Sequence, residues 1–181
     1  MRVDKVHSAF DIEIAYRHFP LHPETPEEGL TLNALFAGRN IDVQTASARM
    51  ANLMAAENLP YGKRTMTYNS RLAQELGKWA ATQAGGKKIH DALFQAYFVD
   101  NVNLAKIENL IQIAESIGLS AVEAKQVLHE RVFRNAVDAD WQRSRALGIT
   151  GVPTFVMGDR RLVGAQSYEQ LRAFVASAPL T

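Results

Sequence analysis

The chain has 181 residues, of which 47% are hydrophobic and 22% charged, a composition typical of a folded domain with a sizeable core. The net charge of +1 gives no electrostatic basis for binding nucleic acid, and no apolar run approaches the ~20 residues of a membrane-spanning helix. The sequence contains no cysteine, which excludes disulfides, thiolate metal sites and a cysteine nucleophile within these residues.

The first two predicted elements precede a cluster of prolines. Val3, Val6 and Phe10 share one face of a helix over residues 1–10, and this helix begins without a cap or a preceding strand. Residues 12–19 start with apolar and polar alternation, which predicts a β-strand that the prolines then end. Because the N-terminus has no apolar signal-peptide core, we expect a cytoplasmic protein.

The middle of the chain is predicted to be helical. Apolar residues recur at helical spacing, Gly118 follows one helix as a C-terminal glycine, and Trp79 is expected in the core. The sequence Ser120-Ala121-Val122-Glu123 is a capping box that opens another helix. The predicted helices cover residues 30–37, 43–57, 69–84, 87–99, 104–117, a segment from Ser120, and 132–147.

A β-hairpin and a last helix are predicted after this run. Residues 154–157 form an apolar strand, Gly158-Asp159 a turn, and residues 162–164 the return strand. Residues 167–170, Ser-Tyr-Glu-Gln, make a second capping box at the start of the final helix. One strand, many helices and then a hairpin indicate an α/β protein with an inserted helical domain.

The candidate binding residues at the mouth of the hairpin are Thr150, Gly151, Val152 and Pro153. A rigid Val-Pro can hold backbone N–H and C=O groups open toward a ligand, and the alternative is an ordinary proline at the start of a strand. Asn69 is either a ligand contact or a plain N-cap. The histidines do not have the spacing of metal ligands, and we expect no metal site.

The sequence resembles the DsbA-like thioredoxin-fold family, in particular its FrnE-like branch and the related 2-hydroxychromene-2-carboxylate isomerases. The resemblance covers nearly the whole chain. It is carried by the Thr-Gly-Val-Pro-Thr-Phe segment with its hairpin, by Arg17-His18-Phe19-Pro20-Leu21, by Pro26-Glu27-Glu28-Gly29, and by Ala92-Leu93-Phe94-Gln95-Ala96-Tyr97-Phe98.

The resemblance implies a thioredoxin-like domain over residues 1–28 and 134–181 and an inserted helical domain over residues 29–133. It also implies that Pro153 is a cis proline beside the active site. In the family a first strand and a Cys-x-x-Cys loop precede the helix that residues 1–10 would complete, and this sequence has neither. We expect either a fragment with a misplaced start, which the abrupt beginning favours, or a relative that lacks the redox segment.

The function implied by the resemblance is a DsbA/FrnE-type thiol–disulfide oxidoreductase, inactive as it stands because no residue supplies the sulfur. The alternatives are a glutathione-dependent isomerase, with glutathione as co-substrate, and a non-catalytic binding module. The expected partners are a thiol or disulfide protein or glutathione, with no nucleic acid and no membrane. We predict no catalytic residue and no resident cofactor. Without the first strand, the open sheet edge is expected to support a homodimer.

Overall fold

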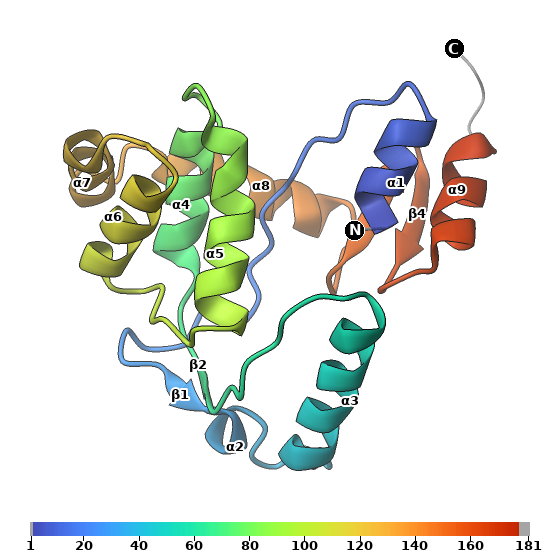
Figure 1. Ribbon diagram of the computed structural model, residues 1–181, viewed down its shortest axis with the longest axis horizontal. Helices are drawn as coiled ribbons and strands as arrows, with labels where there is room; N and C mark the ends of the chain where they lie inside the picture. The colour runs from blue at the N-terminus through green and yellow to red at the C-terminus, as the bar shows by residue number, and fades with distance from the viewer. Residues whose placement is uncertain (1, 178–181) are drawn as a thin grey trace. The chain divides into compact units, whose positions relative to one another are not determined.

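The computed structural model describes residues 2–177 and divides the chain into two compact units (Figure 1). The first unit joins Met1–Phe19 to Asp140–Thr181, and the second is Pro20–Ala139. The predicted domain limits, at residues 28/29 and 133/134, stay a prediction. No helix among the described residues is long and apolar enough to cross a membrane.

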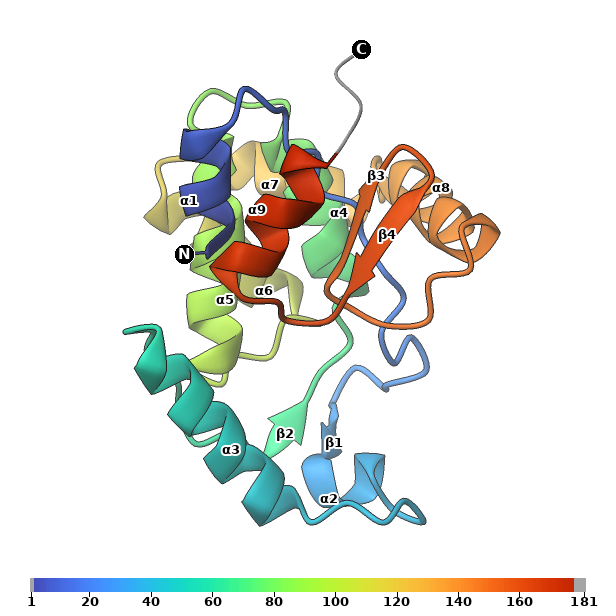
Figure 2. The same cartoon turned by 90° about the vertical axis from the view of Figure 1, so that its right-hand side faces the viewer.

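The first unit contains two helices that pack side by side. These are α1 (Arg2–Ala9) and α9 (Tyr168–Ala176), and both views show them next to each other (Figures 1 and 2). Val6 of α1 and Leu171 of α9 are buried, and Arg2 Nη1 donates a hydrogen bond to the Gln166 carbonyl at 2.8 Å. The helix predicted over residues 1–10 is therefore confirmed.

The hairpin of this unit pairs β3 (Thr154–Met157) with β4 (Arg160–Val163) in antiparallel register, Thr154 opposite Val163 and Met157 opposite Arg160. Gly158 has φ +57°, which suits the first central position of a two-residue hairpin turn. The hairpin and its turn are as predicted, but the return strand runs over Arg160–Val163 and not over residues 162–164. The capping box before α9 is also confirmed, because the Ser167 and Gln170 side chains bond each other's backbone N–H.

The prediction of a β-strand over residues 12–19 is wrong. The structure has no β-strand there, and this segment is held by local and side-chain bonds instead. The Ile12 N–H donates to the Phe10 carbonyl at 3.0 Å, and the His18 N–H donates to the buried carboxylate of Asp140 at 2.9 Å. A strand exists only where a neighbour completes its hydrogen-bond ladder, and within residues 2–177 β3 pairs with β4 alone.

The second unit is mostly helical and is built around one apolar cluster. Leu76 and Trp79 of α4, Ile89 of α5, Leu110 of α6 and Leu128 of α7 are among its buried members, so Trp79 is a core residue as predicted. The helices of this unit are α2 (Leu32–Leu35), α3 (Val43–Ala56), α4 (Arg71–Ala80), the 3-10 turn Gly86–Lys88, α5 (Ile89–Phe98), α6 (Ile107–Ser116), α7 (Ala121–His129) and the first part of α8 (Arg134–Ala146).

Local signals explain most of these boundaries. Gly118 ends α6 with φ +86°, as expected for a C-terminal glycine. Ser120 caps α7 by accepting from the Glu123 N–H at 3.2 Å, which is one half of the predicted box. The segment predicted as a helix from residue 30 instead begins with β1 (Leu30–Thr31), which pairs with β2 (Met66–Thr67). Two-residue strands are too short to show an alternating pattern in the sequence.

Candidate functional site

The predicted site residues Thr150, Gly151, Val152 and Pro153 form the loop between α8 and β3. The Val152–Pro153 peptide bond is cis. Thr154 fastens this loop by donating from its hydroxyl to the Gly151 carbonyl at 2.7 Å. Val152 is 49% exposed, so the loop presents an apolar side chain and its backbone at the surface of the first unit.

The hydrogen-bond register decides which backbone groups of β3 face outward. The Gly164 N–H donates to the Pro153 carbonyl at 2.8 Å, which makes this the first hydrogen-bonded pair of the hairpin. Because such pairs alternate along an antiparallel ladder, Phe155 and Met157 direct their backbone groups to β4. Thr154 and Val156 direct theirs away from β4, and no other strand in residues 2–177 pairs with β3. We call this line of groups the β3 edge.

One face of the hairpin has two exposed valines. Residues opposite each other in the ladder point to the same face, which places Thr154, Val156, Arg161 and Val163 together. Val156 is 39% exposed and Val163 is 60% exposed. The β3 edge is therefore bordered by the apolar side chain of Val156, with Arg161 opposite it on the same face, and its outward backbone groups can pair with another backbone.

Asn69 lies in the second unit, and both the nitrogen and the oxygen of its side-chain amide form hydrogen bonds within that unit. Its Nδ2 donates to the carbonyls of Pro23, at 3.0 Å, and Thr25, at 2.9 Å, while its Oδ1 accepts from the Arg71 N–H at 2.9 Å. Asn69 thus fixes the loop at residues 23–25 to the start of α4, with Ser70 as the N-cap residue. A role for Asn69 in ligand contact stays a prediction.

A charge cluster that the sequence did not reveal joins α4 to later parts of the helical unit. The carboxylate of Glu75, 2% exposed, accepts from Arg71 Nε at 2.7 Å and from Arg131 Nε and Nη2, each at 2.7 Å. Arg71 also pairs with Asp138 at 2.7 Å. Burial raises the pKa of Glu75, but the hydrogen bonds and charges of Arg131 and Arg71 outweigh it, so this pKa lies below its ordinary value.

The chemistry available at the loop and the β3 edge is recognition through the backbone. The 181 residues have no cysteine, and within residues 2–177 no three His, Asp or Glu side chains gather where a metal ion would bind. Backbone N–H and C=O groups with apolar neighbours can bind an extended chain by adding a strand.

Two related proteins differ in how much of their sequence is similar to this chain. YwbO of Bacillus subtilis is 28% identical over 160 residues, which are 86% of this chain and 76% of YwbO. The ClpXP adapter protein SpxH of Halalkalibacterium halodurans is 32% identical over 92 residues, which are 51% of this chain and only 30% of SpxH. The similarity to YwbO extends over most of both proteins, whereas that to SpxH is partial.

Solved structures share the fold. A probable DsbA oxidoreductase from Streptomyces coelicolor matches 99% of this chain and 85% of its own, with a TM-score of 0.86 and 27% identity. A 2-hydroxychromene-2-carboxylate isomerase covers 97% of this chain and 84% of its own, with a TM-score of 0.71 and 14% identity. The cytosolic disulfide reductase DsbM from Pseudomonas aeruginosa, solved with GSH, covers 82% and 78%, with a TM-score of 0.58 and 19% identity.

The expected fold class, a DsbA-like thioredoxin fold with a large helical part, is therefore confirmed. The sequence pattern of one family matches residues 1–176, nearly the entire chain. The chain belongs to the DSBA-like thioredoxin domain family.

Proposed function

We propose that the loop at residues 150–153 and the β3 edge bind the extended backbone of a thiol or disulfide partner, as in a DsbA/FrnE-type thiol–disulfide oxidoreductase. The observation that carries the proposal is the outward direction of the Thr154 and Val156 backbone groups beside the exposed Val152. A tripeptide such as glutathione, or a segment of a protein substrate, pairs with such an edge through main-chain hydrogen bonds.

The proposed role of these 181 residues alone is binding without exchange. Thiol–disulfide exchange requires a thiolate that attacks a disulfide sulfur, forms a mixed disulfide and releases the second sulfur as a thiolate. No residue of this sequence has a thiol, and methionine thioethers do not form mixed disulfides. The partner can therefore be held at the β3 edge, but its disulfide stays intact.

Two measurements test this proposal. In the reduction of insulin by dithiothreitol, the purified chain is expected to leave the rate unchanged, and catalysis would refute the chemistry. In a calorimetric titration with oxidised glutathione, Val156→Pro removes an N–H of the β3 edge, and the loss of one hydrogen bond is expected to weaken binding by about 3- to 10-fold.

The matched control is Val163→Pro. Its N–H also points out of the hairpin, but from the outer side of β4, so glutathione affinity should stay unchanged. Equal losses in both variants, or no loss in either, would contradict binding at the β3 edge. Melting curves of both variants establish that each is folded.

The second candidate is a glutathione-dependent isomerase, a reaction that needs bound glutathione but no protein disulfide. DsbM, which shares the fold, was solved with GSH, and this supports glutathione as the bound molecule. Reduced glutathione binding more tightly than a cysteine-containing peptide would favour this candidate, and the reverse order would favour the oxidoreductase. The cytosolic DsbM also supports a cytoplasmic location, which we propose for this chain.

We further propose that a second copy of the chain pairs with the β3 edge when no partner is present. The exposed Val156 and Val163 would be covered in such a pair. Sedimentation velocity should show dimers whose fraction rises with concentration and falls in Val156→Pro. A monomer at every concentration, with a cooperative melt, would overturn homodimerisation while leaving partner binding in place.

A further inference from the structure

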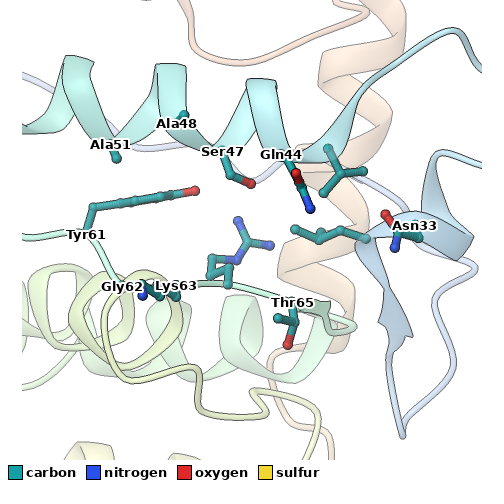
Figure 3. Close-up of a pocket in the computed structure, with 12 residues that line it drawn as sticks. Asn33, Gln44, Ser47, Ala48, Ala51, Tyr61, Gly62, Lys63 and Thr65 are labelled. Carbon is teal, nitrogen blue, oxygen red and sulfur yellow. The ribbon is translucent and has the colours of Figure 1, made fainter.

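A cavity lies wholly within the helical unit, and none of the residues that line it belongs to the loop at residues 150–153. The cavity is open to solvent, has a volume of about 580 Å³ and is lined by α3, by the start of α2 and by residues 61–65 (Figure 3). This volume is within the range of about 300–1,000 Å³ that small-molecule sites have. Figure 3 shows Ser47 and Gln44 directed from α3 toward the opposite wall, where Tyr61 and Thr65 lie.

The α3 wall of the cavity is a row of small and apolar side chains. Val43, Ser47 and Ala51 recur every four residues and line the cavity, and α3 has no buried residue along its length. These side chains do not pack against a core. A shallow trough therefore runs along the 14-residue helix, parallel to its axis. Leu32 and Tyr61 extend the apolar surface.

The opposite wall is held rigidly. The Gly62 N–H donates to the Phe98 carbonyl at 2.8 Å, and a side chain at Gly62 would meet the Val99 carbonyl oxygen at 2.1 Å. The Tyr61 ring stacks on the Phe98 ring, with centroids 6.4 Å apart. Residues 61–65 thus lie directly against the end of α5, and the wall is formed before any ligand arrives.

Arg64 is a positioned cation in this wall. Its guanidinium lies over the rings of Tyr97, at 4.3 Å, and Phe98, at 5.1 Å. Its Nη2 donates to the Tyr97 hydroxyl at 2.8 Å and to the Met66 carbonyl at 3.3 Å, whereas its Nη1 donates to no described residue. A guanidinium fixed on one side with free donors on the other is preorganised for an oxyanion.

No carboxylate balances this charge in the cavity. The lining includes Arg64 and Lys63 but neither Asp nor Glu, and Arg64 forms no ion pair with any residue in the range 2–177. A cation beside an apolar trough favours a ligand that has both a negative group and an apolar body. The negative group then pairs with the cation, and the apolar body packs against the trough.

We propose that this cavity binds an elongated amphipathic carboxylate, with the carboxylate on Arg64 and an aliphatic chain along Val43, Ser47 and Ala51. This site is separate from the proposed function at the β3 edge and does not depend on it. An aliphatic chain fits the row better than a branched or globular group because Ser47, Ala48 and Ala51 leave a trough along the helix.

The test uses sodium decanoate below its micellar concentration, titrated into the full chain by calorimetry and by amide NMR. Decanoate is expected to shift the amides of Ser47, Ala51 and Gly62. Decanol, which lacks the charge, and acetate, which lacks the chain, are each expected to bind at least tenfold more weakly. Equal binding of decanol and decanoate would overturn the role of Arg64.

Three variants locate the site. Arg64→Met should weaken decanoate at least tenfold and leave decanol unchanged, while Ala51→Phe fills the trough and should weaken both ligands with Arg64 intact. Ala55→Phe is the matched control, since Ala55 is exposed on the same helix and does not line the cavity. No saturable decanoate binding to the folded chain, or equal effects of the two phenylalanine variants, would refute the proposal.

Discussion

Glu75 offers the strongest single perturbation of the helical unit. Its carboxylate is 2% exposed and joins α4 to the turn between α7 and α8, through Arg131, while also meeting Arg71. The change Glu75→Gln keeps the shape of the side chain but removes the charge and turns amide hydrogens toward two guanidinium groups. In this cluster Asp138 is then the carboxylate that remains beside Arg71 and Arg131.

The expected loss follows from the burial of the three groups. Removing one partner of a buried ion pair costs about 3–5 kcal/mol. Asp138 still pairs with Arg71, and the Arg131 side chain is 40% exposed, so water compensates for part of the lost charge. We therefore expect Glu75→Gln to lower the free energy of unfolding by about 3 kcal/mol, at the lower end of this range.

The measurement is urea unfolding of the helical unit, followed by the fluorescence of Trp79 in a Trp141→Phe background. Trp79 is 3% exposed within the core of that unit, so its emission reports the packing around Glu75. Glu115→Gln is the matched control, because Glu115 is exposed in the same unit. A loss below about 1 kcal/mol in Glu75→Gln, the value of an exposed pair, would mean that the Glu75 carboxylate does not form a buried ion pair.

The pH dependence of the same variant has a defined sign. The pKa of Glu75 lies below its ordinary value in the folded chain, so its contribution is fully present above the unfolded pKa of about 4.3. That contribution is lost as the pH falls through the depressed folded pKa. The stability difference between the wild type and Glu75→Gln should therefore be constant from pH 7 to pH 5 and shrink in stronger acid.

Three further substitutions test local features. Gly62→Ala places a Cβ 2.1 Å from the Val99 carbonyl oxygen, and we expect a loss of about 1–3 kcal/mol in urea unfolding. Asn69→Ala removes three hydrogen bonds that connect a loop to α4, and the expected loss is about 1–3 kcal/mol, with faster amide exchange at Thr25. Ser167→Ala removes one half of the α9 capping box, and the melting curve should report a loss of about 1 kcal/mol.

A different outcome would contradict each of these three predicted losses of stability. A stable Gly62→Ala would mean that residues 61–65 do not lie against the end of α5. Unchanged stability and exchange in Asn69→Ala would leave its side-chain amide free for ligand contact. Ser167→Gly, which retains much of the capping preference, should cost only a few tenths of a kcal/mol, and a larger loss than in Ser167→Ala would contradict the cap.

The features that the sequence predicted well depend on neighbouring residues. The capping box at Ser167 and the turn at Gly158 are determined by residues within a few positions of each other, and the structure has both as expected. The helix predicted over residues 43–57 ends within one residue of α3, because its alanine, leucine and methionine content favours a helix in any context.

The features that the sequence did not predict depend on distant residues. Residues 12–19 have the composition of a strand, but a strand also needs a neighbouring ladder. The cavity needs α3 to lie opposite residues 61–65, and Arg64 needs Tyr97, which is 33 residues away. The row of Val43, Ser47 and Ala51 is present in the sequence, but it does not reveal the opposite wall of the cavity.

The proposed function depends on the β3 edge binding the backbone of a thiol or disulfide partner. The most direct measurement is amide hydrogen exchange of the full chain with and without saturating oxidised glutathione. We expect slower exchange at Thr154 and Val156, whose N–H groups point away from β4, and unchanged exchange at Arg161 and Val163 on the other side of the hairpin. Protection confined to Arg161 and Val163, or absent from the hairpin while glutathione is bound, would contradict it.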